Sequence, residues 1–286
     1  MNLEASIFPA KIFLFGEYSI LNGSDALVLP LNLYRAVASN DNFLGEKLDG
    51  FIEYIKIQDW FENYFDISKI LEQRDHSWAV SSDIPIGKGL GSSGAFVALF
   101  FQTFNQKDNI CDKELISVLG KLESYFHFHS SGIDPFVSLK KKTCLFSSRG
   151  KSVELLAPER FDLNKLNCHM YLLDSKISRE TSAYIQIFKE KMKTKEFSSN
   201  LNEYCSLVNF VILQLLDSNS FSFELIDKIG IFQRKLFNEM FPQKVLDFVD
   251  SLEEKVALKL CGAGGGGYFQ LFSTSVLKHE NLIEIT

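Results

Sequence analysis

The sequence predicts an α+β protein of two domains, and three observations support this. Strand-like and helix-like segments follow one another without the strict βαβ alternation of a doubly wound sheet. The length of 286 residues suits one large domain or two of ordinary size. Near residue 150 the pattern changes: residues 151–166 carry no clear period, and a strand at 169–173 opens a second run of elements. We therefore expect domains at 1–150 and 151–286.

In the first domain, apolar runs bounded by glycine or proline predict strands at 7–15, 26–29, 31–38 and 76–84. Pro30 is expected to separate the second strand from the third, because proline cannot donate a hydrogen bond to a strand ladder. The apolar run 92–104 is long enough for a buried helix. Another helix is expected from Asp112, a good N-cap residue, to about Phe126.

Glu123 lies close to the apolar stripe of that second helix. The stripe consists of Leu115, Val118, Leu119, Leu122 and Phe126. At 100° per residue, Glu123 is only about 60° from the centre of the stripe. A carboxylate turned halfway toward the interior needs a partner, because unpaired buried charge is costly.

In the second domain, the same patterns predict helices at 179–193, 201–217, 223–239 and 240–252. A strand at 256–260, a glycine turn at 262–267 and a strand at 268–272 follow, and a short tail ends the chain.

The composition argues against several classes of protein. Hydrophobic residues make up 46% of the chain and charged residues 23%, which is typical of a globular protein. The net charge is −6 and the longest basic run is Lys140–Lys142, so nucleic acid is not expected as a partner. No apolar run reaches the roughly 18 residues of a membrane span. The five cysteines are scattered and odd in number. We therefore expect a cytoplasmic protein that has no membrane partner.

The segment Pro85–Gly94 has the composition of a phosphate-binding loop. Three alternate glycines let backbone N–H groups turn toward one point: Gly87, Gly89 and Gly91. Ser92 and Ser93 then open a helix, whose unpaired N–H groups favour a phosphate. A glycine-rich turn can also simply cap a helix, but Lys88 and the two serines favour the phosphate. Lys88 lies inside the glycine run, so the segment is not a Walker A loop.

The second glycine run, Gly262–Gly267, formally fits the dinucleotide fingerprint G-x-G-x-x-G. A strand-like segment follows it instead of a helix, and residues 268–286 are too few for the rest of a βαβ unit. Four consecutive glycines between apolar strands indicate close approach of a ligand or another loop. A flexible hairpin is the alternative.

Three segments together resemble the GHMP kinases, the family named for galactokinase, homoserine, mevalonate and phosphomevalonate kinases. They occur in the order of the family: Pro9–Tyr18, Pro85–Gly94 and Lys259–Gly267. The resemblance spans nearly the whole chain. It implies a first domain like ribosomal protein S5 domain 2 and a second domain with a ferredoxin-like core. It also implies ATP and Mg²⁺ as cofactors, with the γ-phosphoryl group passing to a hydroxyl of a small molecule.

The resemblance also implies roles for individual residues. Asp134 would accept or orient the hydroxyl proton, and Lys11 would pair with it and stabilise the transferring phosphate. Glu123 and Ser93 would hold Mg²⁺, an ion that needs few protein ligands. The nucleotide would lie on Gly87, Lys88, Gly89, Leu90, Gly91, Ser92 and Ser93. The substrate would contact Glu17, Tyr18, Arg179, Thr181 and Gly264. Without the family pattern, a strand lysine and a turn aspartate favour no such roles.

Within the family the likeness is greatest to the mevalonate-kinase branch, and the segments Glu123–Asp134 and Leu173–Thr181 carry it. This implies mevalonate as the acceptor and 5-phosphomevalonate as the product. Tyr18 and Phe128 replace the His and Gly usual in that branch and are expected to reshape the acceptor pocket. Phosphomevalonate kinase is the alternative. Its charged acceptor would need extra cations, for which Arg179 is a candidate, as is Lys176.

Other interpretations differ in the kind of site. His127 and His129 form an H-x-H pair that could be read, with Asp134, as a metal site. This interpretation is disfavoured, because the family pattern also has His at position 127 without using it as a metal ligand. A serine hydrolase is disfavoured because no G-x-S-x-G surrounds the serine pair. A catalytically silent ATP-binding sensor on the same fold is the non-enzyme alternative. A monomer and a homodimer both fit the sequence.

Overall fold

The structure, a computed structural model, describes residues 7–39, 45–75, 78–127, 129–178, 181–217 and 221–285, with the backbone alone at 45–47 and 181–182. The chain forms two compact units, each made of segments that are separate in the sequence. Unit 1 contains Met1–Lys11, Pro30–Pro85 and Gly91–Lys142, and unit 2 contains Ile12–Leu29, Ile86–Leu90 and Thr143–Thr286. No single position divides these interleaved units. The expected domain boundary near residue 150 lies within unit 2. The division of the chain into domains at 1–150 and 151–286 stays a prediction.

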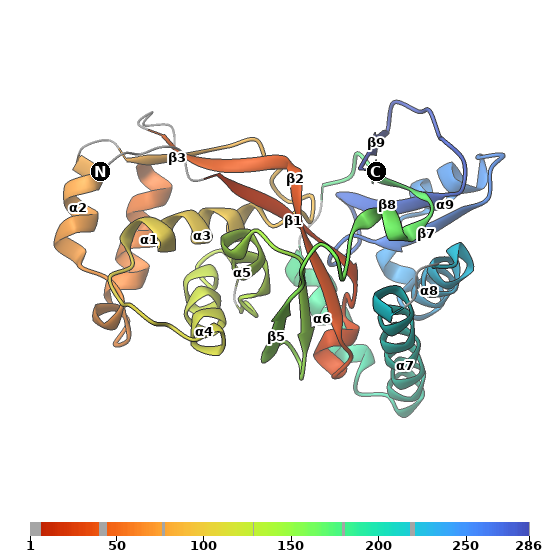
Figure 1. Cartoon of the computed structure of the whole chain (residues 1–286), viewed down its shortest axis with the longest axis horizontal. Coiled ribbons are helices and arrows are strands. Elements are labelled where there is room, and N and C mark those ends of the chain that lie inside the picture. Colours follow the sequence, from red (N-terminus) through yellow and green to blue (C-terminus); the bar gives the residue numbers. More distant parts are fainter. Residues whose placement is uncertain are drawn as a thin grey trace. The chain divides into compact units, whose positions relative to one another are not determined.

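Unit 1 combines helices with an antiparallel strand pair. β1 (Phe8–Phe15) begins in this unit, and most of β2 (Ala26–Ser39) lies in it. β2 pairs with β3 (Ala79–Ser82), with Ala36 opposite Ser82. The helices described in unit 1, coloured from orange to green in Figure 1, are α1 (Gly45–Lys56), η2 (Phe61–Asn63), α2 (Ile67–Asp75), α3 (Ser92–Phe104), α4 (Asp112–Glu123) and α5 (Ile133–Lys140).

Aromatic side chains hold the helices of unit 1 together. Phe51 of α1 meets Phe100 of α3 edge to face, with 4.9 Å between the ring centroids. Trp78 meets Phe104 in the same way, also at 4.9 Å. Such pairs add about 0.5–1.5 kcal/mol each to the effect of burying the rings. The predicted helix at 92–104 is confirmed.

α4 begins at Asp112, as predicted, and ends at Glu123, before the predicted end. The apolar stripe residues inside the helix are buried. Phe126 follows the helix and is 37% exposed, so its assignment to the buried stripe was wrong. Glu123 is only 3% exposed, as its position beside the stripe predicted.

Unit 2 contains a four-stranded antiparallel sheet in the order β7-β8-β6-β9. Its strands are β6 (His169–Asp174), β7 (Val256–Leu260), β8 (Tyr268–Ser273) and β9 (Leu282–Glu284). The first strand of this set lies between the third and the fourth, which is the arrangement of a ferredoxin-like core. Residues 274–281 join β8 to β9 without the second helix of that core. In addition, the first residues of β2 pair with β4 (Cys144–Ser147), which pairs with β5 (Ser152–Leu155).

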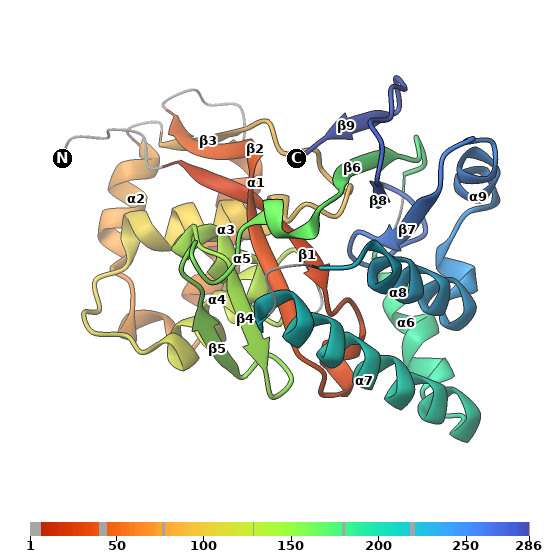
Figure 2. The ribbon, with the colours of Figure 1, turned by 45° about the vertical axis from the view of Figure 1, so that its right-hand side comes forward.

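The helices described in unit 2 are η1 (Ser19–Asn22), η3 (Leu163–Leu166), α6 (Thr181–Lys191), α7 (Lys195–Asp217), α8 (Phe223–Leu236), η4 (Asn238–Met240) and α9 (Gln243–Asp250). Figure 2 shows α8 beside β7, with α7 next to α8. Gly230 of α8 lets the helix approach the Leu258 carbonyl of β7 closely. Among the described helices of both units, none is long and apolar enough to cross a membrane.

The α+β class is confirmed, but one strand prediction was wrong. β2 runs without a break through Pro30, so the two expected strands are one. Residues 26–28 pair with β4 and residues 36–39 pair with β3. Pro30 falls between these ladders, where its missing N–H breaks neither of them.

Candidate active site

Lys11 and Asp134 form an ion pair inside unit 1. Lys11 lies on β1, and Asp134 lies in the first turn of α5. The Lys11 Nζ and the Asp134 Oδ2 are 3.0 Å apart. The Lys11 side chain is 5% exposed and that of Asp134 is 27% exposed. A buried ammonium needs such a partner, and the carboxylate keeps one side open.

Two glycines at the start of α3 allow this pair to form. Gly91 has a φ of +76°, and a Cβ there would lie 2.8 and 2.9 Å from Cγ and Cε of Lys11. A Cβ at Gly94 would lie 2.9 Å from Cβ of Asp134. All three distances are shorter than real Cβ contacts, so larger residues at these positions would displace the ion pair. The glycine at position 94 thus has a packing reason.

Ser93 and Glu123 meet in the same unit. The Ser93 hydroxyl donates to Glu123 Oε1 at 2.9 Å, and the Ser130 hydroxyl donates to Oε2 at 2.5 Å. Burial and, second, the nearby charge of Asp134 raise the pKa of Glu123, while the two hydroxyls and Lys11 lower it; the net result is a pKa of about 7. The role of Ser130 was not predicted, because a serine in a turn gives no signal of its partner.

The Ser93–Glu123 pair fits Mg²⁺ better than it fits a transition metal. Both groups offer oxygen, and Mg²⁺ is usually held by one or two carboxylates together with waters and phosphate oxygens. In the described part of the chain, no cluster of three or more His, Cys, Asp or Glu side chains is suited to a metal. The ligand set His127, His129 and Asp134, which the sequence disfavoured, is therefore not supported by the structure either. His127 instead places Nε2 3.0 Å from the Ser93 hydroxyl.

The expected nucleotide-binding residues belong to both units. Gly91, Ser92 and Ser93 lie in unit 1, at the start of α3. Gly87, Lys88, Gly89 and Leu90 lie in unit 2, where Leu90 is buried. The Lys88 ammonium pairs with the Asp174 carboxylate at 2.7 Å. The partner of Lys88 was not predicted.

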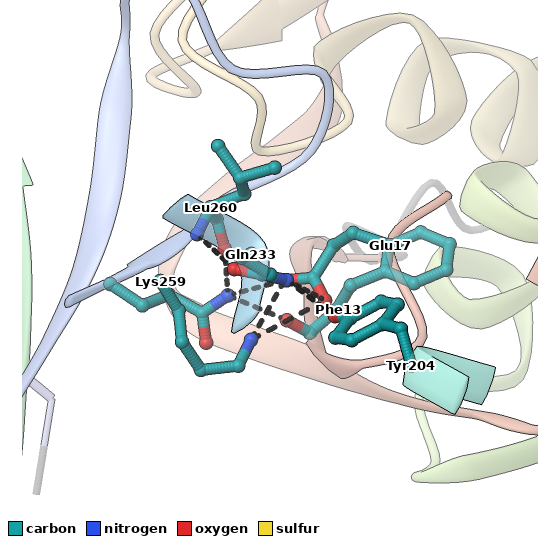
Figure 3. Close-up of polar contacts among 7 residues, drawn as sticks. Phe13, Glu17, Tyr204, Gln233, Lys259 and Leu260 are labelled. Carbon is teal, nitrogen blue, oxygen red and sulfur yellow. Dashed lines mark hydrogen bonds and ion pairs between the residues drawn. The ribbon is translucent and has the colours of Figure 1, made fainter. Parts of the chain in front are cut away.

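Glu17 lies in a buried polar network of unit 2, not on its surface. Its carboxylate contacts the Lys259 ammonium at 3.1 Å and the amide nitrogens of Gln270 and Gln233 at 2.9 and 3.5 Å (Figure 3). Gln233 also accepts a hydrogen bond from the N–H of Leu260 at 2.9 Å. Burial raises the pKa of Glu17, and the charge of Lys259 opposes this. This placement does not favour direct contact with a substrate.

Tyr18 is also buried, and it holds the second glycine run. Its hydroxyl donates to the Ala263 carbonyl at 2.8 Å. Its ring packs against Phe188 and Phe237, at centroid distances of 4.8 and 5.1 Å. Tyr18 therefore acts on the glycine run, and its placement does not favour contact with the acceptor.

Of the remaining expected substrate residues, the structure describes Gly264 and the backbone of Thr181. A Cβ at Gly264 would lie 2.7 Å from Cβ of Met240, so the glycine run is approached by protein atoms. This agrees with the expected close approach of another part of the chain. Thr181 begins α6, but its side chain is not described. Arg179 and Phe128 lie outside the described residues.

The chain resembles known proteins both in sequence and in structure. Residues 56–142 match the family model of the GHMP kinases N terminal domain. Mevalonate kinases of Archaeoglobus fulgidus and Pyrococcus abyssi are 28% and 26% identical to the chain, over 96% and 91% of it and over 95% and 85% of their own lengths. The solved structure of Methanococcus jannaschii mevalonate kinase matches with a TM-score of 0.63 at 18% identity, covering 95% of this chain and 91% of that one. A Streptococcus pneumoniae phosphomevalonate kinase matches with 0.61 at 16% identity, covering 95% and 92%.

The α+β fold and these matches define the class of protein as a phosphotransferase for small molecules with an alcohol group. The chain is similar to the GHMP kinases in the sequence of its N-terminal part and to mevalonate kinases over most of its length, and it shares the fold of this family.

Proposed function

We propose that the protein uses Mg·ATP to phosphorylate mevalonate, giving 5-phosphomevalonate and ADP. One observation carries this proposal: the Lys11–Asp134 ion pair and the Ser93–Glu123 pair lie together in one compact unit. The first pair suits the reacting hydroxyl, and the second suits the metal that accompanies a nucleotide.

Asp134 and Lys11 divide the chemistry at the acceptor. As the acceptor oxygen bonds to the γ-phosphorus, its proton passes to the open side of the Asp134 carboxylate, and the bond from phosphorus to the ADP oxygen breaks. Lys11 is fixed by burial and keeps Asp134 in place. Its charge also stabilises the negative charge on the acceptor and phosphoryl oxygens.

Ser93 and Glu123 would hold Mg²⁺ through one hydroxyl and one carboxylate oxygen. A bound Mg²⁺ neutralises the phosphate charge of ATP. Ser130 keeps the second carboxylate oxygen of Glu123 in a fixed direction, so that the first faces Ser93. The backbone N–H groups at the start of α3 would bind phosphate oxygens.

The choice of mevalonate rests on the sequence relatives, because the fold does not separate the acceptors. Curated relatives that span most of the chain carry the name mevalonate kinase. Structural matches of similar quality include a phosphomevalonate kinase and a Lactococcus lactis galactokinase with a TM-score of 0.59. Phosphomevalonate therefore remains the alternative acceptor. The cytoplasmic location and the oligomeric state stay predictions.

The test is ADP release from Mg·ATP by the purified protein, with mevalonate, phosphomevalonate and homoserine offered separately. We expect turnover with mevalonate, formation of one phosphorylated product per ADP, and loss of both on removal of Mg²⁺. A preference for phosphomevalonate would overturn the acceptor and keep the chemistry. ATP binding without turnover of any acceptor would favour the sensor.

A further inference from the structure

Lys88 is held by two residues that face each other across neighbouring strands. Asp174 ends β6, Tyr268 begins β8, and the two are paired in the sheet register. The Lys88 ammonium is 2.7 Å from the Asp174 carboxylate and 5.7 Å from the centre of the Tyr268 ring. A carboxylate and the face of an aromatic ring both attract a cation. The Asp174 carboxylate also contacts the Lys176 ammonium at 3.2 Å through its other oxygen. Lys88 thus has its charged partner within unit 2.

The main chain of Lys88 is held at the same place. Its carbonyl oxygen accepts a hydrogen bond from the N–H of Tyr268 at 3.0 Å. A Cβ at Gly267 would lie 2.8–3.0 Å from main-chain atoms of Lys88, and Gly267 has a φ of +70°. The last glycine of the second run is therefore needed so that the two loops can touch.

The residues that hold Lys88 are themselves fixed. The Gly267 carbonyl accepts hydrogen bonds from the N–H and the hydroxyl of Ser175, at 3.0 and 2.8 Å. The N–H of Gly267 donates to the Ile177 carbonyl at 2.9 Å. The Asp174 carboxylate also accepts from the N–H of Lys176 at 2.9 Å. Burial raises the pKa of Asp174, but the hydrogen bonds it accepts lower it below the ordinary value.

We propose that Asp174, Gly267 and Tyr268 together hold Lys88, and we call these three residues the Lys88 socket. The socket fixes the glycine-rich loop Pro85–Gly94 in the conformation that binds ATP. In this role Asp174 is a positioning residue, and Lys88 anchors the loop instead of contacting phosphate. The proposal rests on the proposed function, because it assumes that this loop receives ATP.

The physical reason is the cost of ordering a glycine-rich loop. The loop must aim its N–H groups at one point, and its glycines would otherwise sample many conformations. A loop that is already fixed loses less entropy when the ligand binds. If Lys88 were a phosphate ligand instead, Asp174 would compete with ATP for it, and removing Asp174 would tighten ATP binding.

The experiment compares Asp174→Asn, Lys88→Met and the double variant of the full chain. Asp112→Asn is the matched control, because Asp112 also contacts a lysine, Lys140, at 2.7 Å but lies outside the socket. Affinity for ATP is measured without an acceptor, and amide hydrogen exchange is followed at residues 86–90. We expect each single variant to weaken ATP binding about five-fold. The lost contact is charge-assisted, but it acts on ATP only indirectly, by ordering the loop. The loss in the double variant should be clearly smaller than the sum of the two single losses, because both variants remove the Lys88–Asp174 contact.

Faster exchange at residues 86–90 in both single variants, with normal exchange in Asp112→Asn, would support the socket. Unchanged or tighter ATP binding in Asp174→Asn would overturn the proposal, as would additive losses in the double variant. A wild-type protein that binds no ATP would refute the proposed function. The exchange rates would then still decide whether the socket holds the loop.

Discussion

Lys11 and Asp134 differ in exposure although their side chains touch. The lysine is nearly closed off from solvent, whereas the carboxylate is partly open. A closed ammonium can move little, and an open carboxylate can meet an incoming hydroxyl. The two residues therefore have different tasks, and substitutions should separate them.

Asp134→Asn is expected to lower kcat by about a thousandfold or more, because the amide keeps the shape but accepts no proton. ATP affinity should stay within about three-fold of wild type, since Asp134 is not a nucleotide ligand. Steady-state kinetics and ATP titration check both values, with the melting temperature as a control for folding. Turnover close to that of wild type would remove Asp134 from the chemistry.

Glu123 should make the stability of the metal-free protein depend on pH. Folding raises the pKa of this carboxyl from an ordinary 4.5 to about 7. The stabilising contribution of such a group is fully present below the pKa of the unfolded state. It is lost as the pH rises through the pKa of the folded state. Glu123→Gln cannot ionise and does not show this loss. The melting temperature of the variant relative to wild type should therefore increase between about pH 5 and about pH 8. A constant difference would contradict the raised pKa.

At the scale of whole elements, the contact between α3 and α5 positions the site. Gly94 brings the first turn of α3 against the first turn of α5, where Asp134 lies. The two helix starts therefore set the position of the reacting carboxylate together. Adding one methyl group at this contact should therefore move the Asp134 carboxylate.

Gly94→Ala is expected to reduce the free energy of unfolding by about 1–3 kcal/mol, because the added methyl overpacks a tight contact. It should also lower kcat, since Asp134 moves with α5. Chemical denaturation and kinetics check these two effects. Gly23→Ala is a matched control, because a Cβ there meets nothing within 4 Å, although its φ of +100° carries its own strain. Full activity in Gly94→Ala would show that the helix contact does not position Asp134.

Periodicity predicted the elements that bury a continuous apolar face. α3, β7 and β8 have the predicted bounds to within one residue. α2 was not predicted, because Ile70 is its only residue classed as buried and its apolar signal is weak. α5 was not predicted either, because it has only eight residues and its start resembles a simple turn. The inward position of Glu123 followed from helix geometry alone.

At the scale of the whole molecule, the contacts that the sequence did not predict join residues that are distant in sequence. The sequence shows that Glu17 and Lys259 belong to two family motifs, but not that the two touch. Their buried ion pair joins residues 242 positions apart. Lys88 and Asp174 are likewise 86 positions apart. No local pattern predicts such contacts, because they depend on the tertiary fold.

Lys259→Met should destabilise the protein by about 3–5 kcal/mol, because it leaves the carboxylate of Glu17 buried without its counter-charge. Adding Glu17→Gln should restore part of the loss, since the remaining groups are then neutral. Chemical denaturation of the wild type, both single variants and the double variant checks this cycle. A double variant as unstable as the sum of both single ones would show that the pair is not coupled.

The separation of Glu17 from Lys259 also has a consequence during synthesis on the ribosome. Glu17 leaves the ribosome long before its partner exists, since the two residues are 242 positions apart in the chain. At about 5–20 residues per second, the interval is on the order of 10–50 seconds. Throughout that time a lone carboxylate is better placed in water than in a dry interior. The polar core of unit 2 is therefore expected to close only after β7 has been translated, which makes this the late step of folding in the cell.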